Sequence, residues 1–387
     1  MKSVLHVALI GPSGYSNKGL MDGFLQAGFD TYHCFDFQLE SFSIGRDLMR
    51  KRLIYEAEKI KPDLIFMQIQ GSDILDLETF HALRRIAFTV NYTFDIRINE
   101  QTQWLYNLVP DLGLVCFSNQ EDVDECNRRG YNNVMCLQSS ADPDIYKPDE
   151  TKEKKGIVFI GNNFLFTNME FPRSKDRGAM VGFLKDEFKD QFTVYGNNWN
   201  GSKMIGQKEE VEIYQSSAIA INQNNFNHTK YSSDRIWRIM MTGTLCLTEY
   251  FKGIEEMFID GVHLHWWKTL EELRLKINYC LDRPNEAYQV GLRGMIEVRE
   301  NHTWTARVKE MIDFIHSPVI SKEYAYLSTD TKDACIKMGA HVIDGKIPEP
   351  FDKHLDGQAC SCGKIKYVWT ECGCTLKEWQ LRAQENI

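Results

Sequence analysis

The chain has 387 residues, of which 43% are hydrophobic and 26% are charged. This length accommodates two domains with full hydrophobic cores, and the composition excludes a disordered or fibrous protein. The formal net charge of −9 argues against broad electrostatic attraction to nucleic acid or to an anionic membrane, although it leaves room for a local basic groove.

The N-terminal segment is expected to form a first β-strand rather than a targeting signal. Its apolar run is short, lacks a small-residue cleavage site and is followed by a glycine turn. No apolar segment reaches the roughly 18 residues that a helix needs to cross a bilayer. Most of the cysteines are scattered through apolar segments, as reduced core thiols are, so we expect a cytoplasmic protein.

From the N-terminus to about residue 145, apolar strand-like runs alternate with segments of helical periodicity such as 45–60 and 121–129. Strand, helix and strand at this spacing indicate parallel βαβ units and a doubly wound sheet. The predicted strands are residues 4–10, 31–37, 64–70, 86–92, 112–117 and 134–137.

The stretch DPDIYKPDETKEKKG, residues 142–156, combines prolines with many charges and is predicted to be a linker. The alternation then restarts, so we expect an α/β fold with two Rossmann-like domains, residues 1–148 and 156–316, whose strand-end loops face a common cleft. Residues 317–387 are a C-terminal extension. The predicted strands of the second half are 157–160, 192–195, 218–221, 245–248 and 262–266, and its helices are 177–188, 233–241, 270–281 and 286–299.

Residues 230–258 place two arginines close to the end of a predicted strand. Ser232 or Ser233 suits the N-cap of a short helix, on which Arg235 and Arg238 share one face. Guanidinium groups suit a diphosphate, and carboxylates suit the hydroxyl groups of a sugar or ribose. An amphipathic helix with solvated arginines is the alternative interpretation. The candidate carboxylates are Glu249, Glu255 and Glu256.

Three further strand ends carry glycine or asparagine. Glycine lets backbone amides approach a phosphate or sugar, and asparagine adds hydrogen-bond donors. For the first of them, an ordinary β-turn is the alternative interpretation. The residues are Gly161, Asn162 and Asn163 after one strand, Tyr195, Gly196 and Asn197 after the next, and Asn222 and Asn224 after a third.

Several motifs follow one another in order between Ile157 and Phe314. They are Ser233-Asp234-Arg235, Gly243, Leu247-Thr248-Glu249-Tyr250, Gly253-Ile254-Glu255 with Phe258, and His302-Thr303-Trp304 with Arg307. In these motifs the sequence resembles the C-terminal domain of GT-B glycosyltransferases, specifically the group similar to the spore-maturation protein CgeB. The resemblance implies that this domain binds a nucleotide-sugar donor and that the N-terminal domain binds the acceptor. It also implies that Arg235 and Arg238 hold the donor's phosphates, with Tyr231, Ser232 and the glycine- and asparagine-bearing loops around the donor.

In the N-terminal half, the strand-like run TVNYTFDIR leads into Asp95 and Arg97, and the CgeB-like group has a similar strand end. An inverting transfer needs a base for the acceptor hydroxyl, which makes Asp95 the candidate. A helix-capping Asp95 paired with Arg97 is the alternative. The residues Gly11, Ser13 and Gly14 are expected to border the cleft, without the spacing of a dinucleotide fingerprint.

Two motifs contain residue types that bind metals, but we do not predict a metal site at either of them. Asp142-Pro143-Asp144 has the Asp-x-Asp form of GT-A transferases, yet we expect a proline-braced turn, and GT-B enzymes generally need no catalytic metal. His263 and His265 alternate along a predicted strand without a third ligand nearby, so we expect a packed strand.

The C-terminal extension contains two Cys-x-Cys pairs separated by nine residues. A hairpin could bring four thiolates to the corners of a tetrahedron, so we favour a structural Zn²⁺ site over two disulfides or free thiols. The residues are Cys360, Cys362, Cys372 and Cys374.

The sequence therefore predicts a metal-independent glycosyltransferase that moves a sugar from a nucleotide-diphosphate sugar to a hydroxyl group. The acceptor is open between a glycan, a protein, a small metabolite and a hydroxymethylated base in viral DNA. Two alternatives are a nucleotide-sugar epimerase on the same scaffold and a non-catalytic protein whose zinc tail binds nucleic acid. The net charge of −9 weighs against the last.

Overall fold

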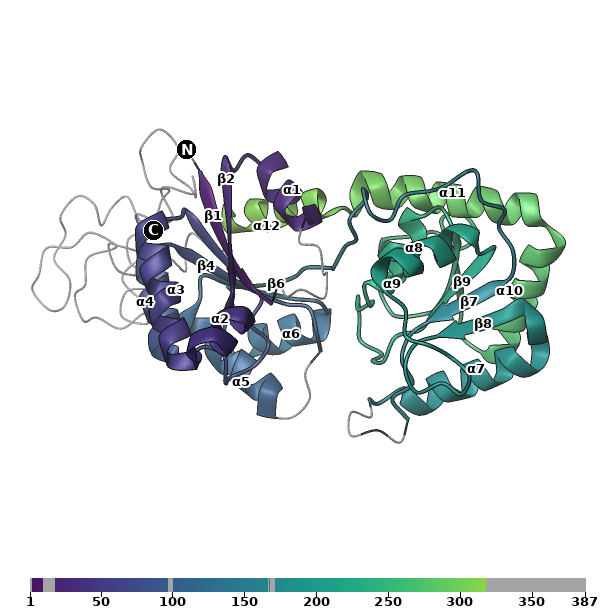
Figure 1. Ribbon diagram of the computed structural model, residues 1–387, viewed down its shortest axis with the longest axis horizontal. Coiled ribbons are helices and arrows are strands. Elements are labelled where there is room, and N and C mark those ends of the chain that lie inside the picture. Colours follow the sequence, from purple (N-terminus) through teal and green to yellow (C-terminus); the bar gives the residue numbers. More distant parts are fainter. Residues whose placement is uncertain (1, 10–17, 97–99, 166, 168–170, 318–387) are drawn as a thin grey trace, which may run out of the picture.

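The computed structural model describes residues 2–9, 18–96, 100–165, 167 and 171–317 (Figure 1). Two parallel sheets lie side by side, each flanked by helices, which confirms the predicted α/β architecture with two doubly wound halves. None of the helices in these ranges is both long enough and apolar enough to cross a membrane.

The first sheet has the strand order β2-β1-β3-β4-β5-β6 within the described residues, and all neighbouring strands are parallel. Its strands are β1 (Ser3–Ala8), β2 (Thr31–Asp36), β3 (Leu64–Met67), β4 (Phe88–Thr93), β5 (Leu114–Phe117) and β6 (Val134–Cys136). The helices between them are α1 (Lys18–Gln26), α2 (Phe37–Ile44), α3 (Arg46–Ile60), α4 (Leu77–Ile86), α5 (Glu100–Leu108) and α6 (Gln120–Arg128).

The second sheet has the order β11-β10-β9-β7-β8, again parallel throughout the described part. Its strands are β7 (Ile157–Ile160), β8 (Phe192–Tyr195), β9 (Ile219–Asn222), β10 (Leu245–Glu249) and β11 (His265–Trp267). Its helices are α7 (Ser174–Phe188), α8 (Gln207–Ser216), α9 (Arg235–Met241), α10 (Leu270–Asp282) and α11 (Pro284–Asn301), followed by α12 (Trp304–Ile315).

Side-chain caps and proline explain where several helices begin. Asp36 accepts hydrogen bonds from the amides of residues 38 and 39 at the start of α2, and Asp76 does so for Thr79 in α4. Thr303 caps α12 in the same way, and Pro284 occupies the first turn of α11, where its missing N–H is not needed.

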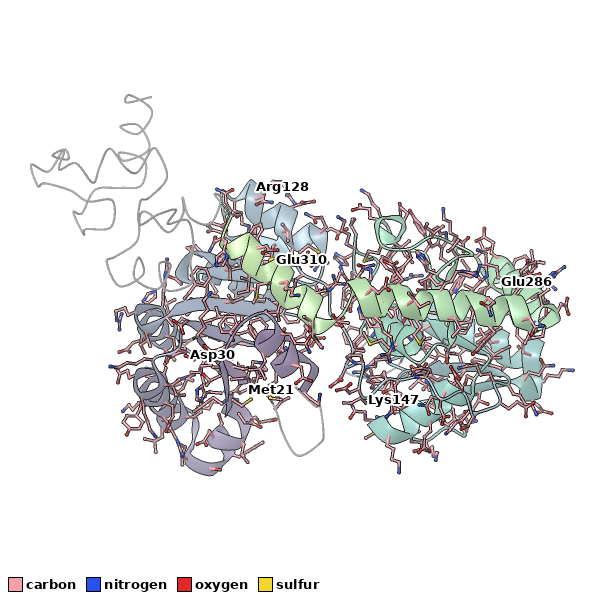
Figure 2. All side chains as sticks on the ribbon, turned by 90° about the horizontal axis from the view of Figure 1, so that it is seen from above. Met21, Asp30, Arg128, Lys147, Glu286 and Glu310 are labelled. Atoms are coloured by element: carbon pink, nitrogen blue, oxygen red, sulfur yellow. The ribbon has the colours of Figure 1, made fainter. Side chains whose placement is uncertain are left out.

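Helix α12 packs on the first sheet, although it follows the second in sequence. Val308, Met311 and Ile315 share a buried cluster with Leu20 and Phe24 of α1. Seen from above, α11 and α12 form one run across both halves, with Glu286 at its outer end and Glu310 beside the first sheet (Figure 2). The packing boundary therefore lies before α12, and not at residue 316 as the sequence suggested.

The segment between the sheets packs on the second half rather than standing free as a linker. Tyr146 is buried in the same cluster as Trp237 of α9, and Lys154 donates to Thr244 Oγ1 at 3.0 Å. Burial lowers the pKa of Lys154 to about 8. Asp142 forms the expected turn, since its side chain accepts from the amide of Asp144 at 2.9 Å.

The last predicted strand begins later than expected. Gly261 adopts a positive φ of 76°, and residues 261–263 form a turn, so His263 precedes β11 and does not alternate with His265 along it. His265 instead lies 3.2 Å from Asp260 Oδ1. No cluster of three potential metal ligands occurs among the residues with described positions.

Candidate functional site

The loops after β7 and β8 are joined by hydrogen bonds at the carboxyl edge of the second sheet. The Asn197 amide donates to Asn162 Oδ1 at 2.9 Å, and Trp199 Nε1 donates to Gly161 O at 2.6 Å. Gly196 has φ +127°, and a Cβ at this position would lie only 2.4 Å from Gly161 O. The close approach of the two loops therefore requires glycine at position 196.

Arg235, the first residue of α9, points to this edge. Its Nε donates to Ile160 O at 2.6 Å, and its Nη1 donates to Asn222 Oδ1 at 3.0 Å and Gln223 O at 3.1 Å. The guanidinium lies over the Phe159 ring, 5.1 Å from its centre. Arg235 is half-buried, and its Nη2 has no hydrogen-bond acceptor among the described residues, so this nitrogen is available to a ligand.

Gly161 keeps the space beside this nitrogen open. A Cβ on Gly161 would lie 3.0 Å from Arg235 Nη2 and 2.9 Å from Phe159 Cζ. The sequence predicted Gly161 and Arg235 separately as site residues, and the structure brings them together.

Arg177 of α7 is a second guanidinium at this edge, and it was not among the predicted residues. It is 2% exposed, lies 5.6 Å from the centre of the Phe159 ring, and donates to Asn162 O and Gln223 O at 3.2 and 2.8 Å. Burial, together with the neighbouring charge of Arg235, lowers its pKa to about 9. Both guanidiniums are thus held mainly by carbonyl oxygens, which leaves positive charge at the site to attract an anion.

Arg238 lies in a different environment from Arg235, although the sequence predicted that both hold the donor's phosphates. Its guanidinium lies 3.3 Å from Glu210 Oε2 and 2.5 Å from Asp234 Oδ2, and 5.7 Å from the Tyr146 ring centre. Two carboxylates therefore balance its charge. Asp234 is the N-cap of α9 without a side-chain cap hydrogen bond, so neither Ser232 nor Ser233 caps this helix as predicted.

The predicted carboxylates are also engaged within the protein. Glu249 forms a two-pronged pair with Arg173, at 2.6 and 2.7 Å, and burial raises its pKa although Arg173 opposes the shift. Glu255 accepts from the Gly253 amide at 3.1 Å and the Tyr250 hydroxyl at 3.2 Å, so it stabilises its own turn. The sequence did not identify Arg173, because its partner lies 76 positions away.

Asparagine side chains hold the loop that leads into α9. Asn222, besides accepting from Arg235, donates to Thr248 Oγ1 at 2.9 Å. Asn224 donates to Tyr231 O and accepts from the Ser233 amide, both at 3.0 Å. Both asparagines therefore position this loop, and their contact with a bound ligand stays a prediction. Ser232 is buried, and its hydroxyl donates to Ser233 O at 3.2 Å.

Asp95 lies at the junction of the two domains. It follows β4 and is exposed, while its neighbour Ile96 packs against Tyr231 and Phe226 of the second domain. The pKa of Tyr231 is raised by burial and further by the charges of Asp95 and Asp234. The structure thus brings Asp95 close to the loop that carries Arg235.

Several predicted residues lie outside the described ranges. They are Gly11, Ser13, Gly14, Arg97, Cys360, Cys362, Cys372 and Cys374.

Comparison with known proteins supports the same architecture. Residues 175–313 match the family model described as Glycosyl transferase-like, while no curated protein is significantly similar in sequence. Anabaena HepE in complex with UDP and glucose superposes with a TM-score of 0.56 at 11% identity, over 81% of this chain and 99% of that one. The sucrose-phosphate synthase of Thermosynechococcus elongatus superposes with a TM-score of 0.53 at 10% identity, over 80% of this chain and 97% of that one.

A glycosyltransferase from Rickettsia africae is also similar, with a TM-score of 0.51 at 12% identity over 81% of this chain and 98% of that one. The chain therefore has the fold of GT-B glycosyltransferases. Its second domain carries the Glycosyl transferase-like sequence signature. Membership of the CgeB-like group stays a prediction.

Proposed function

We propose that the protein is a glycosyltransferase that uses a nucleotide-diphosphate sugar as donor. The observation that carries the proposal is the guanidinium pair Arg177 and Arg235, in which Arg235 Nη2 is available beside Gly161. A diphosphate would accept from this nitrogen and balance the excess positive charge. The structural relatives from Anabaena were solved with UDP and with UDP-glucose, which makes these two compounds the first probes.

In this proposal the second domain binds the donor and the first domain binds the acceptor. Arg235 stabilises the negative charge that develops on the leaving diphosphate, while Arg177 holds the Asn162 and Gln223 carbonyls that frame the site. Asp95 takes the proton from the acceptor hydroxyl when the two domains close. Arg238, Glu249 and Glu255 act as structural supports, because each is already paired within the protein.

Calorimetric titration with UDP and UDP-glucose tests this donor site. Replacing Arg235 with Ala should weaken UDP binding by about 10- to 100-fold, the range expected for loss of one charge-assisted hydrogen bond. Uridine, which has no phosphates, should show a much smaller loss. Arg293→Ala, which removes an exposed arginine that donates to Val262 O, serves as the matched control and should leave UDP affinity unchanged.

Three outcomes bear on this proposal. Equal UDP affinity for the wild type and Arg235→Ala removes Arg235 from the site. Conversion of the bound nucleotide sugar to an epimer without any acceptor would favour the epimerase. Equal affinity with EDTA and with Mg²⁺ would support metal-independent donor binding, as expected when arginines neutralise the diphosphate.

A further inference from the structure

The loop that leads into the proposed donor site is held by the other domain. Thr229 donates its amide to both oxygens of Glu121 at 2.7 Å and its hydroxyl to Oε1 at 2.7 Å. The amide of Gln120 donates to Thr229 O at 3.0 Å. The start of α6 therefore satisfies every hydrogen-bonding group of Thr229, and His228 Nδ1 lies 3.5 Å from the same carboxylate.

The next residue, Lys230, has an unusual backbone conformation. Its φ is +57°, which side-chain-bearing residues adopt only at a cost in free energy. Contacts on both sides hold it there: its amide donates to Lys252 O at 2.7 Å, and its carbonyl accepts from Gln138 of the first domain. The first domain therefore helps to impose this conformation.

A continuous set of contacts runs from Thr229 to Arg235. Tyr231 and Ser233 are both bound by the side-chain amide of Asn224 at 3.0 Å. Ser233 Oγ and Arg235 Nη1 then converge on Asn222 Oδ1, at 3.3 and 3.0 Å. Asn224 and Asn222 thus connect the residues that follow Thr229 to the Arg235 guanidinium. We expect a displacement of Thr229 to move this guanidinium as well.

We infer that Glu121 is a positioning residue for donor binding, although it belongs to the first domain. By holding Thr229 it fixes residues 228–234 and so keeps Arg235 Nη2 directed beside Gly161. Donor affinity then depends on the relative position of the two domains, because separating them removes the contact between Glu121 and Thr229. This inference rests on the proposed donor site, but its effect on the loop is measurable without a donor.

The direct test is amide hydrogen exchange of the full-length chain without ligand, in Glu121→Ala and in the wild type. Loss of three hydrogen bonds to one carboxylate should speed exchange of Thr229 and of residues 231–235 by about 10-fold or more. The matched control is Glu125→Ala, one turn further along α6, since Glu125 pairs only with Arg128 and Arg129 among the described residues. It should leave exchange in this loop unchanged. Faster exchange confined to residues 228–230 would overturn the inference, and so would no change at all.

A second measurement uses UDP as the probe. Glu121→Ala should weaken UDP binding by about 10-fold, and Glu121→Gln, which keeps one accepting oxygen, should recover most of that loss. If Glu121→Ala loosens the loop but UDP binds as tightly as to the wild type, Glu121 is only a structural contact and the inference fails. If the wild type binds no nucleotide, the proposed function fails instead, and the exchange result still shows whether Glu121 orders the loop through Arg235.

Discussion

Gly196 is the residue on which the approach of the two donor-side loops depends. Gly196→Ala would place a Cβ 2.4 Å from Gly161 O, so the loops must separate. Gly201→Ala is a matched control, because Gly201 also has a positive φ, +76°, but a Cβ there meets no atom within 4 Å. We expect Gly201→Ala to cost about 1 kcal/mol of unfolding free energy and Gly196→Ala clearly more.

UDP titration of the same two variants checks the functional side of this prediction. Gly196→Ala should lower the affinity, since separating the loops moves Gly161 away from Arg235 Nη2, whereas Gly201→Ala should not. Similar affinities for both variants would show that the loop contact does not shape the site.

Single residues also show where sequence reasoning stops. Gly161 and Arg235 were predictable because a glycine after a strand and an arginine at a helix start are local patterns. Arg177 was not, because it is distinguished only by its burial, with the guanidinium over the Phe159 ring, and by hydrogen bonds to carbonyls 15 and 46 positions away. The same holds for Arg238, because its partner Glu210 lies on another helix.

At the scale of elements, helix α1 fits closely against α12. A Cβ on Gly23 would lie 3.0 Å from the carbonyl carbon and oxygen of Trp304 and 3.1 Å from the Thr305 amide. These are backbone atoms, so Gly23→Ala should push the helices apart and destabilise the protein by about 1–3 kcal/mol. Urea unfolding measures the change.

The control for Gly23 is another glycine inside a helix. Gly182 of α7 is exposed, and a Cβ there would meet nothing within 4 Å. Gly182→Ala should therefore stabilise the protein by up to about 1 kcal/mol, the difference in helix propensity. Stabilisation by both substitutions would mean that α1 and α12 are not in tight contact.

The alternation of strands and helices was predictable because apolar residues recur with a period of about two residues in a strand and 3.6 residues in a helix. The sheet on which a helix packs cannot be predicted from the sequence of the helix alone. For α12 the apolar face was visible, but its neighbours Leu20 and Phe24 lie almost 300 residues away, near the start of the chain. The sequence boundary at residue 316 failed for this reason.

For the molecule as a whole, the proposed chemistry needs a group from each domain. Asp95→Asn should leave UDP affinity nearly unchanged and reduce turnover by about 100-fold, the usual scale for loss of a general base. The rate of UDP release from UDP-glucose measures turnover, with Asp47→Asn as the control at an exposed acid of the same domain. Normal turnover of Asp95→Asn would assign the proton transfer to another group.

The return of α12 to the first sheet also has a consequence during synthesis on the ribosome. The end of β6 at Cys136 and the start of α12 at Trp304 are separated by more than 160 residues. At roughly 5–20 residues per second, the first half waits on the order of 10 to 30 s for the helix that covers it. During that interval the apolar surface around Leu20 and Phe24 is uncovered in the nascent chain, which makes this half the one that chaperones are expected to bind first.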